Sequence, residues 1–124
     1  LPAYQDYTSR AQVSEAFSLA EGQKAAVIEY FADKGAYPTT NAAAGVAAPA
    51  QITGKYVQSV AIGGNGVITA TMKAKDVNSA LKSKTLTLTP ATTAAGANAA
   101  ANPGSFTWTC GGSIDTKYRP AACR

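Results

Sequence analysis

The chain has 124 residues, 46% of them hydrophobic and 15% charged, with a formal net charge of +4, a composition suited to one compact soluble domain. It contains two cysteines and no histidine, which excludes the usual Cys/His zinc sites, histidine general acid–base catalysis and a Ser-His-Asp triad. No apolar run approaches the roughly 20 residues of a membrane-spanning helix.

Residues 1–34 predict one long helix. Apolar residues recur there at spacings of three and four, which places them on one stripe of an α-helix. Gly22 is a weak point within this helix, and Gly35 is placed to end it. At about 1.5 Å per residue the helix would be roughly 50 Å long, longer than a domain of this size needs. The stripe comprises Val13, Ala16, Phe17, Ala20, Val27, Ile28 and Phe31.

The stripe does not continue to the start of the chain. Tyr4 and Tyr7 are rotated away from it on a helical wheel. We therefore expect residues 1–12 to project from the body and to show both tyrosines to something outside it. The alternative is a frayed terminus with incidental tyrosines. Pro2 suits either the first turn of a helix or a kink inside a longer one, and we favour the kink.

A connecting loop is expected at residues 35–55, because they are mostly small and irregular. Within residues 56–109, four runs then alternate apolar residues with small or polar ones, often threonine. Alternation with a period of two predicts a four-stranded antiparallel sheet with one buried face. The helical stripe is the only apolar partner long enough to cover that face. The predicted fold class is therefore α+β, with one long helix packed on the sheet.

Two segments of the sheet region predict turns or loops. Gly63-Gly64-Asn65-Gly66 predicts a hairpin turn, since Asn-Gly tolerates positive φ. A phosphate-binding loop is the weaker interpretation, because no Lys-Ser/Thr pair follows. The alanine-rich residues 91–104 predict a loop, because glycine, asparagine and proline interrupt them and no apolar stripe anchors them.

Residues 110–124 form the last segment, a loop and tail without the alternation of a strand. Cys110 and Cys123 bound it, and a disulfide between them would contribute about 3 kcal/mol in the chain-entropy model. Such a bond implies an oxidising, extracytoplasmic compartment. The alternative is two reduced cysteines that never meet.

Charge is unevenly distributed along the chain. Residues 1–35 carry five carboxylates and three basic side chains, a net charge of −2. Residues 36–124 carry two carboxylates and eight basic side chains, a net charge of +6. Three interpretations remain open: ordinary surface charge, a basic face that meets the acidic helix of another copy, and a basic face for an anionic partner such as DNA. Because the carboxylates show no pairing suited to acid–base chemistry, we expect no enzymatic activity and no cofactor.

Taken together, several segments resemble the major pilin subunit of bacterial type IV pili. The opening residues are similar to the middle of that family's N-terminal helix, beginning at a helix-kinking proline. The family's preceding apolar half-helix is not part of this sequence, so the resemblance implies an N-terminally truncated form that meets a membrane only through the missing segment. The similar segments are Leu1–Ala16, Gly54–Val57, Ala70–Lys73, Lys84–Leu88, Trp108–Cys110, Lys117–Pro120 and Cys123.

The resemblance implies a structural subunit of an extracellular helical polymer of identical copies, handled by a pilus assembly machinery and anchored in the inner membrane before assembly. Twitching motility, surface adhesion and DNA uptake are the implied roles. Two alternatives stay open: adhesin-like binding of a host surface or glycan through residues 110–123, and a minor pilin or secretion-system pseudopilin. Direct DNA binding by the basic region is a further rival.

Three groups of candidate contact residues follow from this interpretation. The filament-core contacts are expected at the start of the helix, the receptor or subunit contacts in the disulfide loop, and a basic docking face between two strands. These groups are, in turn, Pro2, Tyr4 and Tyr7; Lys117, Tyr118, Arg119 and Pro120; and Lys73, Lys75, Lys82 and Lys84.

Overall fold

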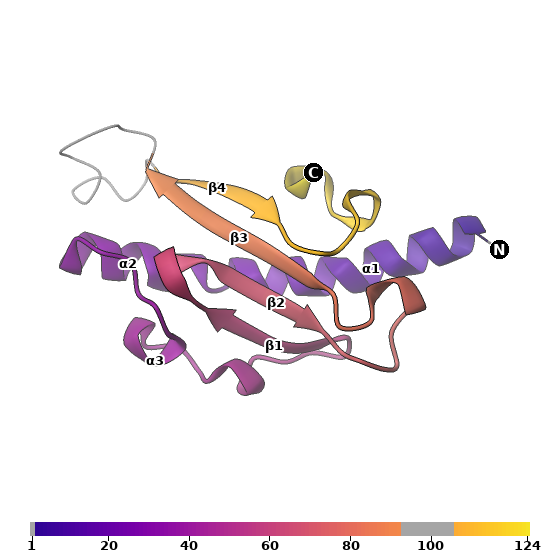
Figure 1. Ribbon diagram of the computed structural model, residues 1–124, viewed down its shortest axis with the longest axis horizontal. Helices are drawn as coiled ribbons and strands as arrows, with labels where there is room; N and C mark the ends of the chain where they lie inside the picture. Colours follow the sequence, from indigo (N-terminus) through magenta and orange to yellow (C-terminus); the bar gives the residue numbers. More distant parts are fainter. Residues whose placement is uncertain (1, 93–105) are drawn as a thin grey trace.

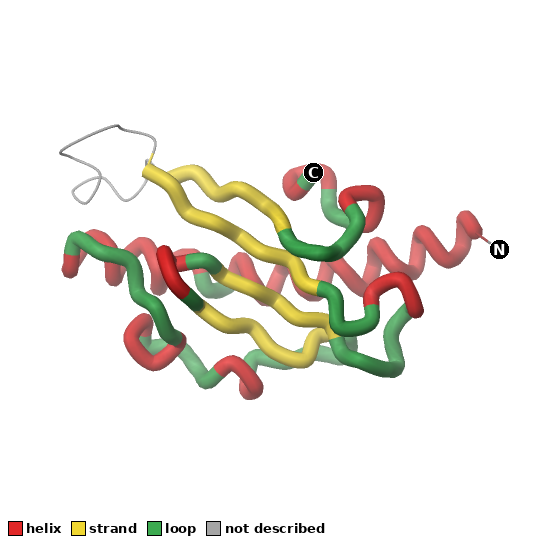
Figure 2. The backbone as a smooth tube through the Cα atoms, viewed as in Figure 1, coloured by secondary structure: helices red, strands yellow, loops and turns green. Residues whose placement is uncertain are grey.

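The computed structural model describes residues 2–92 and 106–124, and it has a helical layer on one face of a sheet (Figure 1). Helices α1 (Pro2–Glu21) and α2 (Lys24–Lys34) run along that face, and α1 contacts three of the four strands. The other face of the sheet is turned toward the viewer in Figure 2, with no helix drawn over it. The predicted α+β fold is confirmed.

The sequence predicts one long helix over residues 1–34, whereas the structure divides it into α1 and α2. The helix is interrupted at Gly22 and Gln23, where the Gln23 N–H donates to the Ala20 carbonyl at 3.0 Å, one residue short of the α-helical spacing. Glycine is the least favourable residue for a helix interior after proline, which explains the position of the break. The predicted end is confirmed: Gly35 adopts φ 71° and donates its N–H to the Phe31 carbonyl.

The core lies between the helices and the sheet. Four members of the predicted stripe are fully buried, and the larger Phe17, Ile28 and Phe31 are half-buried. Phe31 packs against Tyr37 and Phe106, with ring centroids 4.6 and 5.2 Å away. The buried helix and sheet residues form one apolar cluster, which accounts for the attachment of helix to sheet. The buried stripe residues are Val13, Ala16, Ala20 and Val27.

The sheet is antiparallel, in the order β1-β2-β3-β4. The hairpin turn is confirmed between β1 and β2, and Asn65 has the positive φ of 61° that an Asn-Gly turn favours. Threonines on β2 and β3 pair across the exposed face, as in Thr69 with Thr87. The sheet extends slightly beyond the predicted limits of 56–109, ending at Gly111. Its strands are β1 (Val57–Ile62), β2 (Ile68–Met72), β3 (Thr85–Thr92) and β4 (Phe106–Gly111).

The loop predicted at residues 91–104 is partly wrong, because Ala91 and Thr92 belong to β3. Residues 93–105 lie outside the part that the structure describes. β3 pairs with β2 only as far as Leu88 and continues beside β4 alone. Pro90 therefore lies where its missing N–H removes no bond to β2.

The connecting segment 35–55 is more ordered than predicted. It contains the short helix α3 (Asn41–Ala44) and a 3₁₀ turn at Pro49–Gln51. The Asn41 side chain is buried and donates to the Ala47 and Val60 carbonyls at 2.8 and 3.0 Å. It also accepts the Ile62 N–H at 2.7 Å. These bonds fix the segment against the edge strand β1.

Within residues 2–92 and 106–124, no helix combines the length and the apolar character needed to cross a membrane.

Candidate functional site

The first eleven described residues of α1, residues 2–12, are called here the helical arm. Figure 1 shows the N-terminal end of α1 continuing past the sheet. Tyr4 and Tyr7 are 67% and 73% exposed, as predicted. Pro2 begins the helix, and its side chain lies outside what the structure describes. The arm thus presents two large aromatic side chains to solvent, while their role as contacts stays a prediction.

The arm is nevertheless attached to the body, which the apolar pattern did not indicate. Ser9 and Gln12 are only 2% and 9% exposed, although we expected no body-facing side before Val13. Both contact Asn78, which lies in the connection between β2 and β3. The expectation was wrong because it considered only apolar residues, and this attachment is made by hydrogen bonds.

A second attachment joins the arm to the C-terminal segment. The Arg10 Nε–H donates to the Lys117 carbonyl at 2.9 Å. The Lys117 side chain itself is exposed, and its ammonium lies 5.1 Å from the centre of the Tyr118 ring. The pKa of Lys117 is raised above its usual value. The largest cause is a hydrogen bond with the Tyr118 side chain, and the charges of Tyr118, Asp6 and Asp115 contribute less. Lys117 therefore stays charged and accessible beside the arm.

The predicted disulfide between Cys110 and Cys123 is confirmed, with 5.1 Å between their Cα atoms. We call residues 110–123 the disulfide loop. Cys123 and Ile114 are both only 1% exposed, so the loop contributes to the core. It contains two 3₁₀ turns, Thr116–Tyr118 and Ala121–Cys123, instead of irregular chain.

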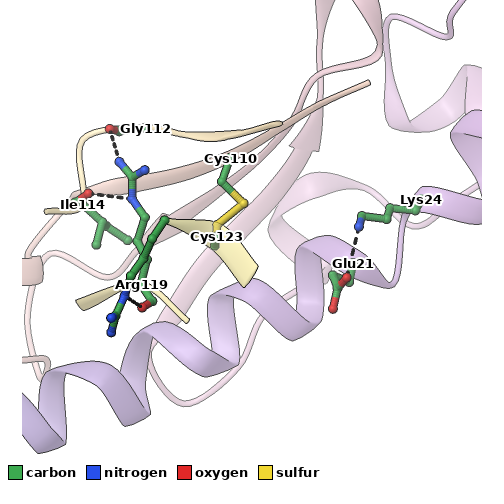
Figure 3. Close-up of a disulfide and its surroundings, with 8 residues drawn as sticks. Glu21, Lys24, Cys110, Gly112, Ile114, Arg119 and Cys123 are labelled. Carbon is green, nitrogen blue, oxygen red and sulfur yellow. Dashed lines mark hydrogen bonds and ion pairs between the residues drawn. A yellow bond between two sulfur atoms is a disulfide. The ribbon is translucent and has the colours of Figure 1, made fainter. Parts of the chain in front are cut away.

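Arg119 overturns part of the predicted contact set. Its side chain was expected to be exposed for a partner, yet it is only 9% exposed. Figure 3 shows its guanidinium turned into the loop, where Nε–H donates to the Ile114 carbonyl at 3.0 Å and Nη2–H to the Gly112 carbonyl at 3.1 Å. A buried charge needs such partners, and here it holds the loop together from inside.

The other predicted contact residues of the loop differ in accessibility. Tyr118 is half-buried and packs against the core cluster, and Pro120 is also half-buried. Of the four predicted contact residues, Lys117 alone is fully exposed. Any partner of this loop would meet Lys117 and the surrounding surface before it met Arg119.

A hydroxyl pair fastens the start of the disulfide loop to β3. Ser113 Oγ accepts the Thr85 N–H at 2.9 Å, and the Ser113 N–H donates to Thr85 Oγ1 at 3.2 Å. The Ile114 N–H then donates to the Thr85 carbonyl at 3.0 Å. Gly112 has φ 105°, and a Cβ there would collide with the backbone of Thr85. The loop therefore has a fixed position on the sheet.

The predicted basic face lies around the connection between β2 and β3. Lys75, Lys82 and Lys84 are exposed and Lys73 is half-buried. Asp76 lies among them, with φ 63°. The structure thus leaves Lys75, Lys82 and Lys84 accessible, and the docking role of the four lysines remains a prediction.

Glu15 has a structural role that the sequence did not reveal. Its carboxylate accepts the backbone N–H groups of Lys55, Tyr56 and Val57 at 3.0, 2.8 and 3.1 Å. These bonds tie the middle of α1 to the entry of β1. Across residues 2–92 and 106–124, no group of three or more histidine, cysteine or acidic residues is arranged to hold a metal ion.

Comparison with known proteins gives consistent matches. A family model described as "Pilin (bacterial filament)" matches residues 9–124. The chain is 53% identical, over its whole length and 76% of the relative, to the fimbrial protein EcpC of Eikenella corrodens. It is 45% identical to a fimbrial protein of Neisseria meningitidis and 44% identical to the type IV major pilin protein PilE of Neisseria gonorrhoeae. These matches again span the whole chain, and cover 81% and 80% of those two relatives.

Proposed function

This chain belongs to the pilin family of bacterial filament proteins, and we propose that its helical arm is the part that joins it to other copies in the filament. As a pilin, it is a structural subunit of a surface pilus and assembles with copies of itself. Membership of this family implies a protein that works by assembly and not by catalysis.

The proposal rests on a difference in burial between the two parts of α1. From Val13 onward, the stripe of the helix packs on the chain's own sheet, with Val13, Ala16 and Ala20 fully buried. On the arm, Tyr4 and Tyr7 are more than two-thirds exposed. An aromatic side chain can bury about 150–250 Å² of surface, so covering both would favour association strongly. The arm is thus the part of the described helix in which large apolar side chains are most exposed.

The head of the subunit, residues 13–124, would make the outer contacts. The connecting segment lies on the β1 edge, and the disulfide loop lies near β4 at the other edge. We propose that both segments meet adjacent subunits. When two different surfaces of neighbouring subunits meet in this way, repetition of the contact produces an open helical filament.

Family membership also supports finer proposals about the filament. The pilus assembly machinery would extend and retract the filament. Before assembly, an apolar segment preceding the arm would hold the subunit in the inner membrane. Its proposed roles are twitching motility, surface adhesion and DNA uptake. For adhesion, the exposed Lys117 on the rigid disulfide loop is the side chain that favours a receptor contact. Glycan-array binding that survives Lys117→Ala would remove that side chain from the adhesive role.

The filament proposal is tested by joining the chain to the apolar N-terminal segment of a type IV pilin and expressing it in a strain without its own pilin. We expect fibres by electron microscopy. A Tyr4→Ser, Tyr7→Ser variant should give far fewer fibres, because it removes the apolar surface of the arm. A matched variant on the exposed sheet face, Thr89→Ser with Thr109→Ser, should assemble normally. Absence of fibres from the unmutated extended chain, with the head folded, would contradict the proposal.

A further inference from the structure

We propose that Asn78 holds the helical arm in place on the head and thereby keeps the tyrosine face of the arm directed toward other subunits. This inference rests on the proposed function, since it concerns the face that the arm offers to neighbouring copies. Asn78 acts as a positioning residue: it holds the arm and does not itself contact the neighbour.

Asn78 makes bonds to four residues of the arm. Its Nδ2 group lies within hydrogen-bond distance of three acceptors, Thr8 Oγ1 at 2.8 Å, Ser9 Oγ at 2.9 Å and the Gln5 carbonyl at 3.2 Å, which share its two N–H donors. Its backbone N–H donates to Gln12 Oε1 at 2.9 Å, and Gln12 Nε2 lies 3.4 Å from Asn78 Oδ1. We call this set of bonds the Asn78 clip.

The clip engages one face of the helix. Gln5, Ser9 and Gln12 are spaced by four and three residues, so they lie one above another on the same side. Tyr4 and Tyr7 are exposed elsewhere on the helix. Without the clip, this end of the helix would be free to bend or fray, and the tyrosines would lose their fixed direction.

Hydrogen bonds hold this end of α1 against the head, while the buried stripe that begins at Val13 holds the rest of the same helix. Among residues 3–12, the buried side chains are those of Ser9 and Gln12, which are both polar and both bond to Asn78. A small polar cavity of about 110 Å³ lies beside the clip. It is lined by Gln5, Ser9, Asn78, Ser79, Ala80 and Tyr118. No apolar side chain of residues 3–12 is buried, so packing by the arm's own apolar residues would compensate little for loss of the clip.

The clip is connected to the core of the head. The Asn78 carbonyl accepts the Leu81 N–H at 2.8 Å, and the Leu81 side chain is fully buried. The connection between β2 and β3 therefore transmits the position of the sheet to the arm. Arg10 bonds to the Lys117 carbonyl and so adds one further link between the arm and the head, separate from the clip.

The first test measures amide hydrogen exchange by mass spectrometry in the 124-residue chain. Asn78→Ala removes every bond made by the Asn78 side chain and keeps the backbone bond to Gln12, whereas Asn78→Asp removes the Nδ2 donors while keeping the size. Ser79→Ala, at an exposed neighbouring position, is the matched control. Once released, the arm becomes a frayed helix end, so both Asn78 variants should exchange at residues 6–12 about tenfold faster or more. Amides of β2 and β3 should keep their protection, and Ser79→Ala should behave as wild type.

Two results would overturn the inference at this level. One is unchanged exchange in the arm of Asn78→Ala. The other is equal acceleration throughout the head, because Asn78 would then be a general stability residue and not a positioning residue.

The second test concerns assembly and uses the extended chain joined to an apolar pilin segment. If the clip sets the outward face of the arm, Asn78→Ala should reduce the number of fibres about tenfold or change the rise and twist of the filament. Fibres equal in number and helical parameters to wild type would refute it. If the unmutated extended chain forms no fibres, the proposed function fails, while the exchange experiment still decides whether Asn78 holds the arm.

Discussion

The Glu15 carboxylate accepts the backbone N–H of Tyr56 at 2.8 Å and thereby joins the middle of α1 to the residue before β1. The neighbouring N–H groups of Lys55 and Val57 bond to the same carboxylate. Gly54 makes this approach possible, because a Cβ atom there would collide with the carboxylate. The helix is therefore attached to the sheet by a polar anchor as well as by its apolar stripe.

Replacing Glu15 should weaken this anchor. Glu15→Ala leaves three N–H groups without their acceptor and should lower the free energy of unfolding by about 2–3 kcal/mol, as expected for bonds to a charged group. Gly54→Ala should destabilise by a similar route, because its methyl group displaces the carboxylate. Urea unfolding measures both. Glu29→Gln, at an exposed position of α2, is the control, and equal stability of Glu15→Ala and this control would contradict the anchor.

Arg119 should behave as a structural residue. Arg119→Ala leaves the Ile114 and Gly112 carbonyls without their donors and should reduce the unfolding free energy by about 2–4 kcal/mol. Arg119→Lys keeps the charge but loses the forked geometry, so it should fall between alanine and wild type. Thermal unfolding measures the series, and Lys117→Ala, at an exposed position, should melt at the wild-type temperature. If Arg119→Ala unfolds together with Lys117→Ala, the guanidinium is not holding the loop.

Removal of the disulfide should loosen the same loop. The Cys110→Ala, Cys123→Ala variant should lose about 3 kcal/mol and melt roughly 10 °C lower, because the unfolded chain regains the entropy of an open loop. Calorimetry of the variant and of the reduced wild-type protein should agree. An unchanged melting temperature in both would show that the hydrogen bonds of the loop suffice without the covalent link.

The strand pattern was the most predictable part of the fold. Alternation and the Asn-Gly turn are local signals, and they predicted the β1–β2 hairpin and the buried face of the sheet. The exposure of Tyr4 and Tyr7 followed from the end of the apolar stripe at Val13. In these cases each residue's neighbours in sequence determine which face it occupies.

Polar residues that act over long sequence distances were missed. Asn41, Asn78 and Glu15 each bond to groups at least 19 residues away, and no local pattern distinguishes such side chains from solvated ones. Arg119 is a predicted contact residue that proves to be buried, although arginine side chains are mostly exposed in proteins. Its burial depends on how the disulfide loop closes, which the spacing of the two cysteines does not reveal.

Alkaline pH should destabilise the aromatic cluster of Phe31, Tyr37 and Phe106. Burial raises the pKa of Tyr37 above its usual value of 10.0, because the charged phenolate is poorly solvated there. The folded state thus holds the proton more tightly than the unfolded state. This contribution to stability is complete below about pH 10 and is lost as the pH rises through the folded-state pKa.

Tyr37→Phe checks this effect while keeping the ring. Urea midpoints measured between about pH 8 and about pH 11 should fall less steeply for the variant than for wild type. Tyr4→Phe, which changes an exposed ring, should follow the wild-type slope. Identical slopes for Tyr37→Phe and wild type would show that this tyrosine does not cause the loss of stability at alkaline pH.

Charge reversal at the basic face should weaken assembly. We predict that Lys73, Lys75, Lys82 and Lys84 attract acidic residues of a neighbouring α1–α2, among them the exposed Glu21, Glu29 and Asp33. Changing the four lysines to glutamate in the extended chain should reduce fibre yield about tenfold at low salt and less at high salt. Adding Glu21→Lys and Glu29→Lys should restore part of the yield. Unchanged yield in the lysine variant would refute the docking role.

The most direct measurement is a cryo-electron microscopy reconstruction of filaments grown from the extended chain. It should show Tyr4 and Tyr7 buried against helices of neighbouring subunits, while Val13, Ala16 and Ala20 remain packed on the subunit's own sheet. A filament in which both tyrosines face solvent, with subunits joined through their heads alone, would contradict the role given to the helical arm.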